Sequence, residues 1–324
     1  MIVNYDMVLN TYYNIRGNIR NKKKVIRFEI LLNSNINYLV DSINNNTYKL
    51  SKYNIFIIHE KKYRVILSNN IFDKIYNHLV SNLILSKLDK YLINSNTASR
   101  VNKGINYSRY LLWKYLNKVK NNDFYVLKFD IKKYFFNIDH DILLKLLSKY
   151  LNKDELLIIK NILDSTNLEY INNKINYFNN KYSLELPFYK YNKGLSIGSV
   201  CSQMLAIFYL NEFDHFIKEK LNCKYYIRYM DDGIIFDNDK DKLKNVYFIL
   251  IELIKKYKLE FNSKTRIYNG KNGFNFLGIN YYVVDKRIIK RISKRNKKKI
   301  IKRINYNNYM FYKNYLKYVK LLIR

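Results

Sequence analysis

Apolar residues recur every second position in some segments, which predicts strands, and every three to four positions in others, which predicts helices. Residues 54–58 and 63–67 are rich in β-branched and aromatic side chains and flank a short polar stretch, so they predict a hairpin. Residues 124–130 predict a buried strand that ends in an acid. Between Phe72 and Leu92 the apolar positions follow helical spacing, which predicts a helix.

Helical spacing recurs further along the chain. It predicts helices over residues 141–150, 154–163, 203–221 and 243–259. The first fifty residues alternate Asn/Lys-rich stretches with apolar patches and predict short helices of modest stability. Because strands alternate irregularly with helices, we predict an α+β fold and not a doubly wound sheet.

Two adjacent acids, Asp231 and Asp232, lie between the apolar-aromatic runs 225–229 and 233–236. This pattern predicts a tight hairpin with both carboxylates at its tip. Neighbouring ionised carboxylates raise each other's pKa unless a cation joins them. Carboxylates suit Mg²⁺, which keeps bound phosphates as its other ligands. A solvated turn is the plain alternative, because Asp favours turns.

Asp130, at the end of the strand predicted over 124–130, supplies a third acid. Beside the hairpin it would bring three carboxylates around one point. Three carboxylates can hold two metal ions roughly 3.5–4 Å apart, which clamp the attacking and leaving oxygens of an in-line phosphoryl displacement. The sequence therefore predicts two Mg²⁺ ions, for which Mn²⁺ can substitute.

The composition excludes several classes of protein. With 324 residues, 48% of them hydrophobic, the chain is expected to be globular with two or three subdomains. Two cysteines and four scattered histidines exclude a disulfide framework or a zinc cluster. No apolar run approaches the roughly 18 residues that span a bilayer, and no secretory signal is evident, so we expect a cytoplasmic location without membrane contact.

The formal net charge of +33 points to a polyanionic partner. A codon bias toward Lys and Asn would also enrich Asp and Glu, so it does not explain an excess of one sign. Nucleic acid is the expected partner, because an anionic membrane usually selects a compact basic segment on a neutral body.

The basic excess is strongest near the C-terminal end. Eleven of residues 286–303 are Lys or Arg, and no acid follows Asp285. Ile288, Ile292, Ile300 and Ile304 would form an apolar stripe on a helix. A solvated helix would carry acids for pairing, so contact with a phosphate backbone is favoured. The candidate contacts are Lys290, Arg291, Lys294 and Arg295.

Three segments stand in order along the chain: residues 129–140 (FDIKKYFFNIDH), 193–203 (KGLSIGSVCSQ) and 229–232 (YMDD). Together they resemble, in order and in spacing, the first, second and third palm motifs of prokaryotic reverse transcriptases. The resemblance covers roughly residues 50–305. It implies a right-hand polymerase fold with fingers, a palm and a short helical thumb.

The same resemblance implies a domain layout. It divides the chain into an N-terminal extension (1–50), fingers (51–123), a palm (124–285) with a helical fingers insertion at about 141–192, and a basic thumb (286–324).

The resemblance also assigns roles to residues. Asp130, Asp231 and Asp232 would be catalytic and, with Ile131, form the metal site; Asp130 and Asp231 would be indispensable and Asp232 a weaker ligand. Lys62 and Arg64 would hold the incoming triphosphate, unless they belong to an ordinary surface hairpin. Further nucleotide contacts would come from Phe135, Ile197, Gly198, Gln203 and Lys264.

Phe135 corresponds to the residue that packs under the deoxyribose and excludes a 2′-hydroxyl, although an isolated Phe is more often core. Lys264 lies with Asn262 and Thr265 in a segment that resembles the fourth motif. Arg100 and Lys103 match a second fingers motif and would bind nucleic acid. Gly278 would let the backbone of the primer-grip hairpin approach the primer.

Ile197 and Gln203 stand where most relatives carry Gln and Pro. This pattern resembles the reverse transcriptases of diversity-generating retroelements, which copy a template RNA with errors at adenines. Ile offers only a branched apolar surface, and losing a polar contact weakens discrimination, unless Ile197 simply packs. Gly233 stands where a bulky apolar residue is usual and is expected to soften the hairpin.

Two rival functions remain at this point. One is an antiphage-defence reverse transcriptase that makes defined or untemplated DNA; the other is an inactive RNA-binding scaffold, which the three acids disfavour. The partners implied are an RNA template, a DNA or RNA primer, dNTPs and a small basic accessory protein.

Overall fold

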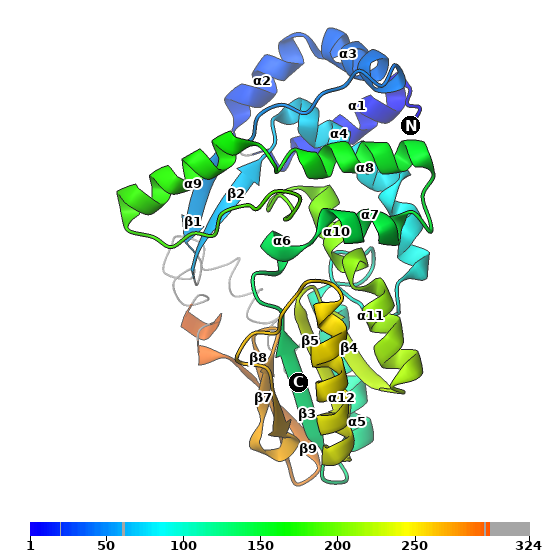
Figure 1. Cartoon of the computed structure of the whole chain (residues 1–324), viewed down its shortest axis with the longest axis vertical. Helices are drawn as coiled ribbons and strands as arrows, with labels where there is room; N and C mark the ends of the chain where they lie inside the picture. Colours follow the sequence, from blue (N-terminus) through cyan, green and yellow to red (C-terminus); the bar gives the residue numbers. More distant parts are fainter. Residues whose placement is uncertain (20, 60–61, 295, 299–324) are drawn as a thin grey trace, which may run out of the picture. The chain divides into compact units, whose positions relative to one another are not determined.

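The computed structural model describes residues 1–19, 21–59, 62–294 and 296–298 (Figure 1). The chain forms two compact units, each built from segments that are separate in the sequence. Unit 1 contains Met1–Ile93, Lys132–Glu212 and Lys255–Leu259, and unit 2 contains Asn94–Ile131, Phe213–Ile254 and the described part of Glu260–Arg324. Among the described residues, no helix is both long and apolar enough to cross a membrane.

Unit 1 is mainly helical. Its helices are α1 (Tyr5–Arg16), α2 (Lys22–Ile30), α3 (Leu32–Asn44), α4 (Ile71–Leu83), the 3₁₀ helix η1 (Leu85–Tyr91), α6 (Tyr134–Asn137), α7 (His140–Leu147), α8 (Lys153–Asp164), α9 (Glu169–Tyr182) and α10 (Val200–Tyr209). Asparagine caps start several of them: the side chains of Asn4, Asn70 and Asn152 each accept a main-chain hydrogen bond from the first turn.

The one hairpin described in unit 1 pairs β1 (Asn54–His59) with β2 (Tyr63–Ser68) in antiparallel register. Leu67 of β2 is fully buried in a core that α9 completes with Ile171, Ile175 and Phe178. The hairpin is therefore held on one face by apolar packing, while Arg64 on β2 is exposed.

Unit 2 contains two antiparallel sheets. The first has the strand order β4 (Tyr225–Tyr229), β5 (Asp232–Asp237), β3 (Tyr125–Asp130), β6 (Arg266–Asn269). The second has the order β7 (Phe274–Phe276), β8 (Ile279–Val284), β9 (Arg287–Ile292). The helices are α5 (Ile105–Val119), α12 (Lys240–Lys255), the π-helical turn η2 (Phe216–Lys220), the 3₁₀ turn η3 (Gly270–Asn272), and α11 (Asn211–His215), which begins in unit 1.

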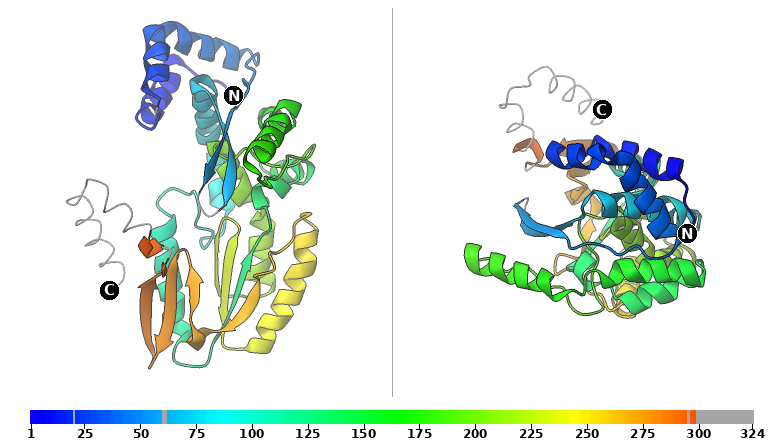
Figure 2. Two further views of the ribbon diagram at one scale, coloured as in Figure 1. Left: turned by 90° about the vertical axis from the view of Figure 1, so that its left-hand side faces the viewer. Right: turned by 90° about the horizontal axis from the view of Figure 1, so that it is seen from above.

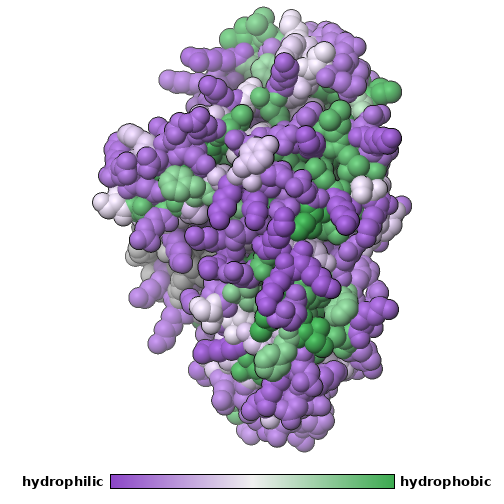
Figure 3. Space-filling model, viewed as in Figure 1, coloured by the Kyte–Doolittle hydropathy of each residue, from purple (hydrophilic) through white to green (hydrophobic). Residues whose placement is uncertain are grey.

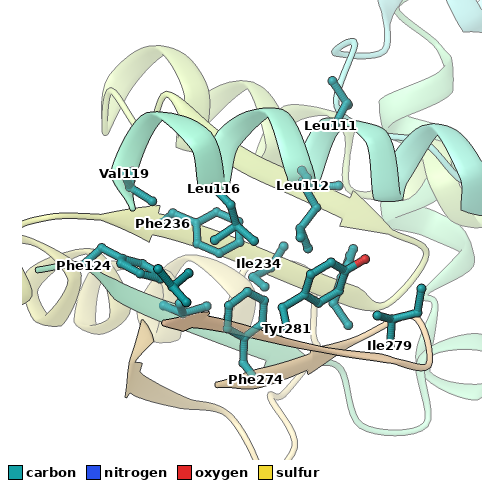
Figure 4. Packing of buried hydrophobic residues seen from close by; sticks show 14 residues of the cluster. Leu111, Leu112, Leu116, Val119, Phe124, Ile234, Phe236, Phe274, Ile279 and Tyr281 are labelled. Atoms are coloured by element: carbon teal, nitrogen blue, oxygen red, sulfur yellow. The ribbon is translucent and has the colours of Figure 1, made fainter. Parts of the chain in front are cut away.

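Alternation along the strands gives the first sheet two apolar faces. On one face, α5 and the second sheet pack onto Val126, Ile234 and Phe236, as Figure 4 shows for Leu112, Leu116, Phe274 and Tyr281. On the opposite face lies α12, whose buried stripe contains Leu243, Val246 and Leu250 (Figures 1 and 2). Hydrophilic side chains cover most of the molecular face in Figure 3.

Most of the predicted elements are confirmed. The hairpin over 54–67, the strand over 124–130, and helices within 72–92, 141–150, 154–163 and 243–259 are all present. The predicted α+β fold is also confirmed. The single helix predicted over 203–221 is wrong: α10 ends at Tyr209, and α11 and the π-helical turn η2 follow. Apolar residues continue through the break, so the pattern does not mark it.

The helix expected from Ile288 through Ile292 is a strand. β9 pairs with β8 and alternates half-buried with exposed side chains, so Ile288 and Ile292 share one face. A spacing of four residues fits a helix face and also, being even, a strand face. Residues 294 and 296–298 are helical, while Ile300 and Ile304 lie outside the described residues.

The predicted domain boundaries remain predictions. The units of the structure are divided at other positions: α5 belongs with the sheet of unit 2, and the segment 132–212 belongs wholly to unit 1.

Candidate active site

The tetrad 229–232 forms the tip of the β4–β5 hairpin. Tyr229 pairs with Asp232, so Met230 and Asp231 make a two-residue loop. Met230 has a φ of 57°, the positive value that a tight hairpin turn requires at its first central position. Because Met has a Cβ, this conformation costs about 1–2 kcal/mol.

Asp130 and Asp232 are direct partners in the antiparallel register of β3 and β5. Such partners have Cα atoms about 4.5–5.5 Å apart and side chains on the same face. Asp231 lies one residue before Asp232 in the turn. The prediction that the hairpin and the strand end meet is therefore confirmed for these carboxylates.

The environment of the pair opposes ionisation. Burial raises the pKa of Asp130, and the charge of Asp232 raises it further; Lys128, Asn262 and Lys264 act in the other direction. Burial also raises the pKa of Asp232, against the effect of Lys128, whose Nζ lies 3.8 Å from Oδ1 of Asp232. A divalent cation would relieve both effects.

The described side chains around Asp130 and Asp232 do not form a complete set of metal ligands. In the part of the chain that the structure describes, no three His, Cys, Asp or Glu side chains form a metal-binding group. The facing carboxylates of Asp130 and Asp232 fit a cation, and Asp231 lies in the adjacent turn. Three carboxylates around one point therefore remain a prediction.

The predicted fourth motif lies against Asp130. The Asn262 amide donates to the Asp130 carbonyl at 2.6 Å, and the Asp130 amide donates to Oγ1 of Thr265 at 3.4 Å. Ile131 forms a β-bridge with Phe261 beside them. Lys264 is thereby held near the carboxylate pair.

The second motif lies along β2. The Leu67 amide donates to the Ile197 carbonyl at 3.0 Å. Gly198 has a φ of 122°, and a Cβ there would lie 3.2 Å from the Leu67 carbonyl oxygen. Ile197 is half-buried and Gln203 is exposed. The glycine thus permits close approach to the strand that carries Arg64.

The other residues predicted to contact the nucleotide are exposed or half-buried side chains of unit 1. Lys62 and Arg64 are exposed, and Phe135 is half-buried against the Tyr134 ring, with its carbonyl accepting from the Leu195 amide. All the predicted nucleotide contacts except Lys264 belong to unit 1, whereas the carboxylates belong to unit 2. Their shared pocket therefore stays a prediction.

Arg100 and Lys103 lie in a loop of unit 2 that extends the edge of the first sheet. Nη1 of Arg100 donates to the Asn96 carbonyl at 2.9 Å, and Nζ of Lys103 donates to the Asn94 carbonyl at 3.1 Å. Asn96 forms a parallel bridge with Arg228 of β4. The two cations are thus attached to the strand that leads into the tetrad.

Gly278 lies in a two-residue turn between β7 and β8, in which Leu277 and Gly278 both have positive φ. A Cβ on Gly278 would lie 2.0 Å from Nδ2 of Asn296, and Nη2 of Arg109 donates to the Leu277 carbonyl at 2.9 Å. The glycine therefore admits the Asn296 side chain; approach to a primer remains a prediction.

The tail residues lie on or after β9. Lys290 is half-buried, and burial lowers its pKa. The Arg291 guanidinium lies 5.6 Å from the Tyr282 ring centre, and Lys294 follows the strand. Arg295 lies outside the described residues.

Gly233 does not leave an empty space in the hairpin. It pairs with Phe129, and a Cβ on Gly233 would lie only 2.0 Å from Cζ of that ring. Phe129 is buried and contacts the rings of Phe213, Tyr226 and Phe261. The ring fills the site, so the expected softening does not follow.

Three residues that support the site were not predicted from the sequence: Lys128, Arg109 and Arg228. Lys128 was detectable, because it stands two positions before Asp130 and so on the same face of the strand. Arg228 showed only as a charge in an aromatic strand. Nothing in the sequence links Arg109 to the turn at Leu277.

Comparisons with known proteins agree with this geometry. Residues 50–281 match the family model of reverse transcriptase (RNA-dependent DNA polymerase). Among solved structures, telomerase from Candida albicans with a fragment of telomeric RNA aligns with a TM-score of 0.55 at 14% identity, over 75% of this chain and 46% of that one.

Two structures of apo telomerase from Candida tropicalis align similarly. The one truncated from its C-terminal domain has a TM-score of 0.51 at 16% identity, over 77% of this chain and 58% of that one. The other has a TM-score of 0.53 at 16% identity, over 74% and 47%. No curated protein matches the sequence.

This chain therefore spans about half the length of those telomerase structures. The likeness, at these identities, concerns the fold, which is that of a right-hand polymerase. Since the family model covers more than half of the sequence, the chain belongs to the reverse transcriptase (RNA-dependent DNA polymerase) family.

Proposed function

We propose that the chain is an RNA-directed DNA polymerase that adds dNTPs to a primer 3′-hydroxyl. The observation that carries the proposal is the facing pair Asp130 and Asp232, with Asp231 in the adjoining turn. Burial raises the pKa of both carboxyl groups, so a bound cation would favour their ionised form, and family membership supplies the reaction class.

In this proposal Asp130, Asp231 and Asp232 hold Mg²⁺, with Ile131 beside them. Bound Mg²⁺ would lower the pKa of the primer hydroxyl and stabilise the leaving pyrophosphate. Lys62 and Arg64 grip the triphosphate as cations, and Lys264 contributes a further positive charge near Asp130. Phe135 excludes a 2′-hydroxyl and thereby selects dNTPs.

The polyanionic substrate accounts for the net charge of +33. Arg100, Lys103, Lys290, Arg291 and Lys294 would contact template and primer phosphates in this proposal, as would Arg295. These contacts fix the duplex without reading its sequence.

Primer extension on an RNA template tests the activity. Asp130→Asn and Asp231→Asn should abolish dNTP incorporation, because each removes a metal-binding charge. Asp241→Asn is the matched control: it also removes one carboxylate charge, but from an exposed position on α12. Full incorporation by the Asp231→Asn variant would contradict the proposal.

We further propose that the enzyme is of the mutagenic retroelement type and works with a small basic accessory protein. Ile197 supports this subclass, because a branched apolar side chain offers no hydrogen bond to the nascent base pair. Ile197→Gln should then lower misincorporation opposite template adenine relative to the other bases.

Sequencing cDNA made from a mixed-sequence RNA measures the error spectrum. An unchanged adenine error rate in the Ile197→Gln variant would remove Ile197 from the argument. Product of one defined sequence, or product formed without any template, would instead favour the antiphage-defence type.

A further inference from the structure

A buried ion pair lies on the face of the sheet opposite to the carboxylates. Arg228 and Asp214 are each 0% exposed in their side chains. Nε of Arg228 donates to Oδ1 of Asp214 at 2.7 Å, and Nη2 donates to Oδ2 at 2.7 Å. This two-point geometry fixes the plane of the guanidinium as well as its position.

Asp214 is further satisfied by two neutral donors. The Tyr226 hydroxyl donates to Oδ1 at 2.7 Å, and Nδ2 of Asn96 donates to Oδ2 at 3.2 Å. These contacts come from β4 and from the loop beside it. The aspartate therefore anchors the guanidinium from several directions.

The remaining end of the guanidinium reaches the catalytic turn. Nη1 of Arg228 donates to the Met230 carbonyl at 2.7 Å. That carbonyl belongs to the same planar peptide unit as the Asp231 amide, so fixing one fixes the other. The hydrogen bond from Arg228 therefore restrains the backbone of Asp231.

The turn needs such support. Met230 has a φ of 57°, which a residue with a Cβ rarely adopts unless its surroundings enforce it. A buried ion pair is in general no more stabilising than well-packed apolar residues of the same size. A contribution to global stability alone therefore does not explain why arginine stands here.

We propose that Arg228, held by Asp214, is a positioning residue that sets the Met230–Asp231 peptide plane and so aims the Asp231 carboxylate. The proposal rests on the proposed polymerase function. It assigns no contact between Arg228 and substrate, because the guanidinium lies on the opposite face of the sheet.

Arg228→Lys tests the proposal, because a single ammonium group keeps the charge but loses the fork. In primer extension by the full-length chain, kcat should fall about 10- to 100-fold, the usual effect of losing a group that orients a metal ligand. The KM for dNTP should stay within about twofold, because Arg228 does not touch the nucleotide.

Mn²⁺ binding, measured by electron paramagnetic resonance without nucleic acid, gives a readout apart from activity. Arg228→Lys should weaken Mn²⁺ affinity about tenfold or more. Ile227→Val is the matched control, since this neighbour on β4 is equally buried and pairs with Ile234, away from the turn residues. It should lower Tm slightly and leave kcat and Mn²⁺ affinity unchanged.

A second variant pair isolates the turn itself. Met230→Gly removes the conformational penalty, because glycine adopts positive φ freely. The loss of kcat caused by Arg228→Lys should therefore be smaller in the Met230→Gly background. A purely structural arginine would show the same loss in both backgrounds.

The variant Arg228→Gln with Asp214→Asn keeps the test decisive if the lysine variant fails to fold. It leaves no unpaired buried charge, yet the fork to Met230 is gone. Wild-type kcat and Mn²⁺ affinity in either folded variant would overturn the positioning role. Absence of polymerisation by the wild-type chain would instead overturn the proposed function.

Discussion

Gly233→Ala should damage both the stability and the activity of the chain. The added Cβ would lie 2.0, 2.3 and 2.6 Å from three carbons of the Phe129 ring, whereas carbon atoms in contact are about 3.5–4.0 Å apart. The ring would therefore have to move by about 1.5–2 Å. It is 1% exposed and enclosed by other aromatic rings, so no free space receives it.

Overpacking of this kind typically destabilises by about 1–3 kcal/mol. Phe129 directly precedes Asp130, and Gly233 directly follows Asp232, so the displacement acts on both facing carboxylates. A misplacement of about 1 Å at reacting groups costs on the order of 100-fold in rate. We therefore expect kcat to fall more sharply than Tm.

Thermal unfolding and single-nucleotide primer extension measure the two effects. Phe129→Leu shortens the obstructing side chain, so the loss of stability in the double variant should be smaller than the sum of the single losses by about 0.5 kcal/mol or more. Gly17→Ala is the control, because nothing lies within 4 Å of its added Cβ. Wild-type Tm and kcat in Gly233→Ala would refute the reasoning.

Three further predictions concern neighbouring features. Folding raises the pKa values of Asp130 and Asp232 above 3.8, so protonation of these two carboxyl groups favours the folded chain, and this stabilisation should be lost as the pH rises through the raised values. The free energy of unfolding, measured against pH without divalent cations, should show this loss, and Asp130→Asn should reduce it. Phe135→Ala should raise rNTP use relative to dNTP use in single-turnover extension, and unchanged discrimination would show that Phe135 is plain core. Arg109→Lys should weaken primer–template binding severalfold in a fluorescence anisotropy titration, because the hydrogen bond to the Leu277 carbonyl is lost; an unaltered Kd would separate that turn from primer binding.

The sequence was sufficient to predict the elements that carry Asp130, Asp231 and Asp232. The apolar run over 124–129 placed Asp130 at the end of a buried strand, and the apolar runs around Asp231 and Asp232 predicted a hairpin. Each of these signals is local, because strand alternation and turn chemistry depend on neighbouring residues. The expectation that the strand end with Asp130 lies beside the hairpin concerns residues far apart in the sequence, and it agrees with the pairing of Asp130 and Asp232. The register itself was not predicted.

The contacts of Arg228, Asp214 and Gly233 depend on residues that are distant in the sequence, so local patterns could not predict them. Arg228 lies in a strand, and the pattern of that strand does not indicate which residue pairs with its charge. Asp214 lies where a continuous helix was expected, and only the break after Tyr209 shows how its segment is arranged. Gly233 had no meaning until the register with Phe129 was known.

The discontinuity of unit 2 has a consequence during synthesis. β3 is translated before its partner strands β5 and β6, which begin roughly a hundred residues later or more. At about 5–20 residues per second, this apolar strand has no partner in the nascent chain for several seconds or longer. Lys128 and Asp130 are its only charges, and charges of this kind suppress aggregation of exposed strands. The acid that we propose for catalysis therefore also protects the chain during synthesis, and the yields of Asp130 variants will reflect both effects.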